Sequence, residues 1–177
     1  MTMVELVLVI GILAMAFGML TSTMVANDRQ RQINRESALA AEAARDVFER
    51  MRNAEFGELF ATYNANPADD PGGAGSAPGN TFSVPGLELP AGSPRAAVGE
   101  IVMPALAPGG GAWELREDVV DEALGLPRDL DGDSLIDDRN HAFDYMLLPV
   151  RVELEWDGLY GPRRLSVSVL MADIRKT

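Results

Sequence analysis

The sequence predicts an α+β fold in which one long N-terminal helix packs on a small antiparallel β-sheet head. Two observations support this prediction. Apolar residues fill the start of the chain and then recur at helical spacing, with no Gly or Pro between Met19 and Phe56. Near the other end of the chain, two segments alternate apolar and polar residues with the period of two that is typical of half-buried strands.

The first element is an apolar helix over residues 1–27, which is long enough to cross a membrane. No charged residue occurs from Leu6 to Asn27, a run of 22 positions. At about 1.5 Å per residue the run spans about 33 Å, whereas a bilayer core is about 30 Å thick. A secretory signal peptide or a simple signal anchor is the alternative. Against it, the first cation is Arg29 and no small-residue cleavage site is evident.

Glu5 stands inside this apolar start. An ionised carboxylate in a membrane helix costs roughly 2.5–3.5 kcal/mol on insertion scales, so Glu5 is a candidate functional residue that needs a partner. The ammonium group of Met1 lies about one helical turn away, and pairing with a cation in low dielectric offsets much of that cost.

Thr2–Ile10, an apolar run with glutamate at position five, resembles the mature N-terminus of type IV pilins and pseudopilins. The resemblance implies that a prepilin peptidase removes a short leader, that Met1 is then N-methylated, and that the numbering is that of the mature chain. Met1 stands where the family more usually has phenylalanine. The resemblance also implies that Glu5 of an incoming subunit meets the amine of a subunit already in the filament and sets the axial register.

The function implied by this resemblance is a structural subunit that polymerises into a helical filament. Its partners would be copies of itself, related minor pilins and the inner-membrane assembly platform. The chain would reside in the bacterial inner membrane before assembly and in an extracellular filament at the cell surface afterwards. Two alternatives stay open. One is a pseudopilin of a type II secretion system, with a periplasmic filament, and the other is a monomeric, membrane-anchored calcium-binding surface module.

The helix is expected to continue as an amphipathic segment over residues 28–56. Charged residues, Glu36 among them, are expected on its solvent side. The apolar residues recur at spacings of three, four or seven: Ile33, Ala40, Ala44, Val47, Met51 and Ala54. Two helices hinged near residues 21–23 are the alternative. A further short turn of helix is expected at 56–60.

Residues 57–177 are expected to form a β-rich head that begins with a long connecting loop. Residues 64–112 contain 10 Gly and 8 Pro, a composition typical of surface loops. Short strands are expected within this loop at Thr81–Val84 and Ala97–Met103.

The clearest β-signal is an antiparallel hairpin near the C-terminus. Its strands alternate apolar and polar residues over 150–156 and again over 165–171. We expect its apolar face to pack on the side of the helix formed by residues 40–54. A strand at Ala112–Leu115 is expected to extend the same sheet.

An acidic loop at residues 129–140 has the sharpest chemical pattern. Carboxylates at relative positions one, three, five and nine, with a backbone carbonyl at seven, match the ligand spacing of EF-hand-type calcium loops. Ser134 replaces the usual glycine at position six, and Asn140 replaces the closing glutamate, so weaker binding is expected. The flanks are predicted to form a hairpin insertion. The candidate ligands are Asp129, Asp131, Asp133, the Leu135 carbonyl, Asp137, Asp138 and Asn140.

The alternative is a solvated acidic turn without an ion, held open by repulsion between its carboxylates. Of the net charge of −12, residues 113–149 alone contribute −8, from 11 acidic and 3 basic residues. Calcium is therefore the predicted cofactor. It would cross-link the loop as a disulfide does in many pilins.

Composition excludes several other classes of function. The chain has 27 acidic and 15 basic residues, and this balance argues against a nucleic-acid partner. The absence of Cys excludes disulfides, thiolate zinc sites and iron–sulfur clusters. The single histidine, His141, is expected at the surface near Asp144, and no catalytic motif occurs. We therefore expect no enzymatic activity.

Overall fold

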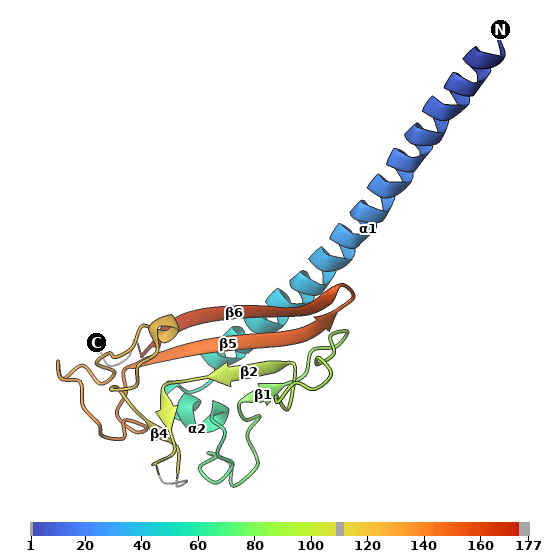
Figure 1. Ribbon diagram of the computed structural model, residues 1–177. Coiled ribbons are helices and arrows are strands. Elements are labelled where there is room, and N and C mark those ends of the chain that lie inside the picture. The colour runs from blue at the N-terminus through green and yellow to red at the C-terminus, as the bar shows by residue number, and fades with distance from the viewer. Residues whose placement is uncertain (1, 109–111, 174–177) are drawn as a thin grey trace.

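The chain begins with α1 (Met3–Asn53), a single helix whose first half projects away from a small β-sheet head (Figure 1). The computed structural model describes residues 2–108 and 112–173, so the predicted assembly and methylation site at Met1 lies outside the described residues. No break occurs near residues 21–23. The hydroxyls of Thr21 and Thr23 donate to the Phe17 and Met19 carbonyls, at 2.9 Å each, which is compatible with an unbroken helix. The prediction of one helix is confirmed.

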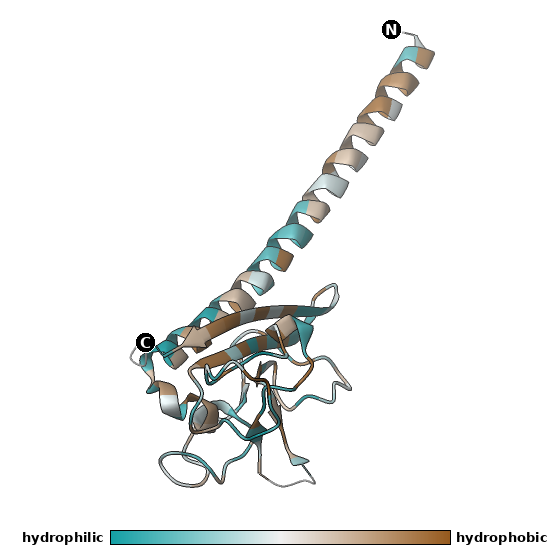
Figure 2. Ribbon diagram, turned by 90° about the vertical axis from the view of Figure 1, so that its left-hand side faces the viewer, coloured by the Kyte–Doolittle hydropathy of each residue, from teal (hydrophilic) through white to brown (hydrophobic). Residues whose placement is uncertain are grey.

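The two halves of α1 have opposite environments. In the projecting half, large apolar side chains such as Ile12, Phe17 and Met19 are exposed, and Figure 2 shows this half as mostly hydrophobic. The described part of α1 is long and apolar enough to cross a membrane. In the second half, one face is buried in the core, with Ala40 and Met51 fully inaccessible.

The head is built on a four-stranded antiparallel sheet in the order β1-β2-β5-β6. Its strands are β1 (Thr81–Phe82), β2 (Gly99–Val102), β5 (Leu147–Gly158) and β6 (Gly161–Ala172). In the β5–β6 hairpin Val150 pairs with Val169 and Val152 with Val167, so apolar residues meet across the strands on one face. Both strands contact α1. The predicted hairpin and its packing on the helix are confirmed.

Short elements complete the head. After α1 the chain forms η1 (Phe56–Glu58) and α2 (Leu59–Tyr63), which confirms the expected turn of helix and extends it to Tyr63. The 64–112 region contains β1 and β2, within the predicted strand ranges. A 3₁₀ turn, η3 (Glu122–Leu124), precedes the acidic loop.

The prediction for residues 112–115 is wrong in its sheet partner. The strand there, β4 (Glu114–Leu115), pairs with β3 (Ala105–Leu106) in a separate two-stranded sheet. A strand of two residues has too short a side-chain pattern to specify its partner, so the fold of the connecting loop decides the pairing.

The prediction that Glu36 faces solvent is also wrong. Glu36 lies on α1 beneath the β5–β6 turn and is 7% exposed. Gln32 Nε2 donates to its carboxylate at 3.0 Å, and the backbone N–H of Leu159 does so at 3.4 Å. Burial alone would raise the pKa of Glu36, but these hydrogen bonds hold it below its usual value. The carboxylate thus ties the turn to the helix.

Candidate metal centre

The acidic loop lies between η3 and β5, at the end of the head far from the N-terminal tip of α1 (Figure 1). Residues 127–146 contain no strand, so the predicted hairpin insertion is wrong. Side chains, rather than strand pairing, determine the path of the loop.

Three of the predicted ligands gather at one point. Asp129, Asp131 and Asp133 each direct a carboxylate oxygen into a group whose atoms all lie within 4.8 Å of one another. Three hard oxygens at this spacing suit a cation such as calcium, which prefers carboxylate and carbonyl ligands.

Backbone amides hold these carboxylates in place. Asp129 accepts from the N–H groups of Gly132 and Ser134, at 2.5 Å and 2.8 Å. Asp131 accepts from the N–H of Asp133 at 3.0 Å, and Asp133 accepts from that of Leu135 at 2.7 Å. The loop therefore winds tightly around the three carboxylates.

The backbone turn at position six occurs as the calcium-loop pattern requires. Ser134 has φ of 68°, in the left-handed region that usually favours glycine, and Gly132 has φ of 84°. The serine therefore takes the conformation of the glycine that it replaces. Leu135 has a hydrocarbon side chain, so only its backbone carbonyl is a candidate ligand.

The remaining predicted ligands lie outside this group. Asp137 accepts from Arg139, at 2.9 Å from the backbone N–H and 2.5 Å from Nε. The Asn140 Oδ1 atom accepts from the N–H groups of Leu115 and Ala142, so it anchors the loop to β4. Asp138 is exposed.

Glu117, which the sequence did not single out, supports the loop from beneath. Its side chain is 1% exposed. One carboxylate oxygen accepts from the N–H groups of Leu130 and Asp131, at 2.6 Å and 3.4 Å, and the other accepts from that of Asp137 at 3.2 Å. A single buried carboxylate thus connects the start of the acidic loop to its later part.

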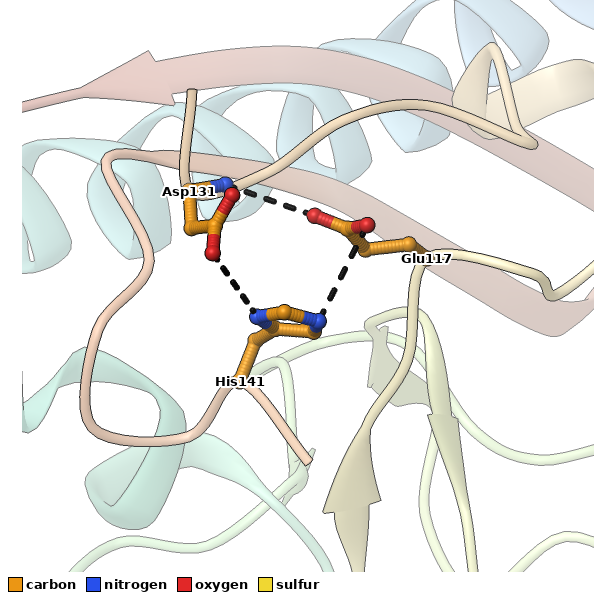
Figure 3. A group of neighbouring side chains, drawn as sticks. All are labelled: Glu117, Asp131 and His141. Carbon is orange, nitrogen blue, oxygen red and sulfur yellow. Dashed lines mark hydrogen bonds and ion pairs between the residues drawn. The ribbon is translucent and has the colours of Figure 1, made fainter. Parts of the chain in front are cut away.

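His141 completes this support and is buried, so its predicted surface position is wrong. Its Nδ1 atom lies 3.6 Å from Asp131 and 3.2 Å from Asp144, and Nε2 lies 3.8 Å from Glu117 and 3.1 Å from Asp137. Figure 3 shows the imidazole bridging Glu117 and Asp131. These three residues form a second group of potential metal ligands.

The electrostatics favour a structural role for His141. Burial alone would lower the pKa of His141, but the hydrogen bond to Asp137 and the charges of Glu117, Asp144 and Asp131 raise it above its usual value. A protonated imidazole donates from both nitrogens and has no lone pair for a metal. When it is protonated, His141 supplies positive charge among four carboxylates and cannot ligate a metal.

The loop carboxylates with altered pKa values are ionised at neutral pH. Burial alone would raise the pKa of Asp129, but the amides of Gly132 and Ser134 lower it. The backbone amide of Arg139 is the largest influence on Asp137, whose pKa falls to about 2. Ionised carboxylates are the form that binds a cation.

The predicted assembly residue Glu5 lies at the other end of the molecule, in the first turn of α1. Its Oε2 atom accepts from the backbone N–H of Thr2 at 3.3 Å. A carboxylate in a first helical turn lies near the positive end of the helix dipole.

Comparison of the chain with protein-family models, with curated proteins and with solved structures finds no match.

Proposed function

We propose that this chain is a structural subunit of a type IV pilus-like filament, anchored in a membrane before assembly by the first half of α1. The observation that carries the proposal is the exposed apolar half of α1 with Glu5 in its first turn. The fold, a long helix packed by its second half on a small antiparallel sheet, is compatible with it.

The apolar half of α1 needs a non-aqueous environment. Leu8, Leu13 and Leu20 are each more than half exposed, as are most large side chains between them. An apolar surface of this extent is not stable in water and marks a membrane or protein contact. A bilayer covers it before assembly, and neighbouring helices cover it in a filament.

Glu5 gives that contact a register. A carboxylate inside an apolar bundle is costly unless a cation compensates it. The Met1 ammonium of a neighbouring subunit is the proposed partner. Because only one axial offset brings the two groups together, the pair selects that offset, as a buried polar residue does in a coiled coil.

The test compares Glu5→Ala with the matched control Glu49→Ala, which removes a carboxylate from the exposed face of α1 within the head. Both variants are expected in the membrane fraction. Glu5→Ala is expected to lose filaments in sheared surface material seen by electron microscopy, whereas Glu49→Ala retains them. Normal filament yield from Glu5→Ala would overturn the proposed register.

The candidate metal centre favours one second function, a pseudopilin of a type II secretion system. In a head without cysteine, calcium at Asp129, Asp131 and Asp133 would replace a disulfide as the cross-link of the distal loop. Filaments confined to the periplasm would favour this function over a surface pilus. A chain that stays monomeric in the membrane would instead favour an anchored calcium-binding module.

A further inference from the structure

The turn between β5 and β6 lies against α1 close to the point where its apolar segment ends (Figures 1 and 2). The turn is formed by Leu159 and Tyr160. The Arg29 guanidinium lies 5.1 Å from the centroid of the Tyr160 ring, and the Leu159 amide bonds to Glu36. The first contact places the Tyr160 ring beside Arg29, and the second ties the turn to a residue about 10 Å further along the helix, so the turn lies beside residues 29–36.

The position of Arg29 along the helix coincides with a membrane surface if α1 spans a bilayer. The uncharged segment ends at Asn27. At about 1.5 Å per residue Arg29 is about 3 Å further along the axis. A bilayer core of about 30 Å within a total of about 40–45 Å leaves a headgroup layer of about 5–7 Å on each side. Arg29 and the ring of Tyr160 therefore fall within this layer.

The side chains of the turn suit that layer better than water. Leu159 is 69% exposed and Tyr160 is 48% exposed, at a position where tight turns usually carry small polar residues. Tyrosine is enriched at membrane–water interfaces because its ring is apolar and its hydroxyl is polar. The guanidinium groups of Arg29 and Arg31, both exposed, match the geometry of phosphate.

Net charge contributes little to this preference. Asp28 and Asp157 flank the arginine and turn positions in the sequence and offset part of the positive charge. Apolar insertion and hydrogen bonds to phosphate therefore favour the headgroups, so a zwitterionic phospholipid should suffice.

We propose that the Leu159–Tyr160 turn, together with Arg29, docks into the phospholipid headgroup layer of the membrane that α1 spans. The inference rests on the membrane anchoring within the proposed function. Because α1 continues unbroken into the head, this second attachment fixes the rotation and tilt of the head over the bilayer. The turn must leave the headgroups when the subunit leaves the membrane.

The test uses the full chain, reconstituted at one copy per phosphatidylcholine nanodisc. Because the chain has no cysteine, single-Cys variants can carry an environment-sensitive fluorophore. Leu159→Cys reports on the turn. The control Phe143→Cys is also strongly exposed but lies beyond the acidic loop, at the other end of the head. Leu13→Cys reports on the membrane span.

Headgroup nitroxide lipids are expected to quench the label at 159 several-fold more strongly than at 143, and mid-acyl-chain nitroxides to quench the label at 13. Equal quenching at 159 and 143, with normal quenching at 13, would overturn the docking of the turn alone. Loss of quenching at 13 would overturn the membrane anchor as well.

Two further variants test which side chains bind. In the Leu159→Cys background, Tyr160→Ser and Arg29→Gln are expected to reduce headgroup quenching, whereas Arg45→Gln, at an exposed position within the head, leaves it unchanged. The same label is also measured in discs that hold several copies of the chain. If its fluorescence shows an apolar environment only in those discs, the turn binds another subunit and the proposal fails.

Discussion

Glu117 illustrates how one residue can organise a loop that carries no regular structure. It is buried and accepts from three backbone amides, and its neighbour His141 contacts two of the loop carboxylates. A buried carboxylate is costly unless its oxygens are hydrogen-bonded, and here both are. The position of Asp131 therefore depends on a side chain that precedes the acidic loop by several residues.

The substitution Glu117→Gln tests this dependence. Glutamine replaces one carboxylate oxygen with an NH₂ group, which donates and cannot accept. At least one of the backbone N–H groups that Glu117 binds therefore loses its acceptor. We expect the free energy of unfolding to fall by about 1–3 kcal/mol. The measurement is urea denaturation of the full chain in detergent micelles. Glu122→Gln, at an exposed position in η3, is the control and should change little. Equal stability of the two variants would show that Glu117 does not support the loop.

At the scale of elements, the two faces of β5 have different chemistry. Val150, Val152 and Leu154 are buried against α1. On the other face Arg95 pairs with Glu153, and with Glu155 at 3.3 Å, while Arg151 pairs with Asp121 at 2.8 Å. Burial alone would raise the pKa of Glu153, but Arg95 and Arg151 lower it below its usual 4.5. The sheet thus has an ionic face opposite its apolar one.

From the ion pairs on this face we predict that the free energy of unfolding depends on pH, and that Arg95→Met reduces this dependence. A carboxylate whose pKa is lower in the folded state stabilises the fold above its unfolded pKa, and that contribution is lost as the pH falls through the folded value. For Glu153 the loss begins near pH 4.5 and continues below it. Arg95→Met should destabilise the protein by about 1–3 kcal/mol at pH 7. It should also flatten the decline of stability below pH 4.5.

Chemical denaturation of the full chain in micelles at pH 7, 5, 4 and 3 measures this effect. The control Arg164→Met removes another cation that pairs with Glu155. Its side chain is 66% exposed, so the loss should cost about 0–1 kcal/mol. A parallel acid decline in wild type and Arg95→Met would contradict the role given to Arg95.

Much of the fold could be predicted from the sequence because its main elements carry local periodic signals. The apolar start of the chain, followed by a stretch without Gly or Pro after Met19, predicted α1. The alternation around Val152 and Val167 predicted the hairpin. The burial of Glu36 could not be predicted in this way. Its burial comes from the β5–β6 turn, which is far from it in sequence. Likewise the two-residue β4 is paired by the path of the connecting loop.

The candidate site divides in the same way. Alternate spacing was sufficient to bring Asp129, Asp131 and Asp133 together, because alternate residues of a tight loop face one concavity. The spacing could not show that Arg139 engages Asp137. Nor did any motif link Glu117 to the loop. His141 stands beside the loop in the sequence, but its burial depends on the tertiary fold.

At the scale of the whole molecule, charge and apolar surface are segregated along its length. The projecting half of α1 has no charge from Leu6 to Asn27, whereas residues 113–149 carry a net charge of −8. The repulsion within this acidic end is offset in part by Arg116 and Arg139, and by His141 when it is protonated. A bound divalent cation would offset more of it, so the stability of the head should depend on calcium.

We therefore predict that calcium raises the thermal stability of the full chain in micelles. Sites of this ligand type bind at about 10⁻⁴–10⁻³ M, so 10 mM calcium should stabilise the folded state by about 1.4–2.7 kcal/mol. The measured result is a rise of several degrees in Tm that EDTA reverses.

The double variant Asp131→Asn with Asp133→Asn should abolish the rise. Asp138→Asn, which removes an exposed carboxylate outside the three-oxygen group, should retain it. An equal rise in Tm with magnesium would indicate general screening of charge at the acidic end. An unchanged Tm with calcium would indicate a solvated turn without an ion. Either result would contradict a calcium site in the loop.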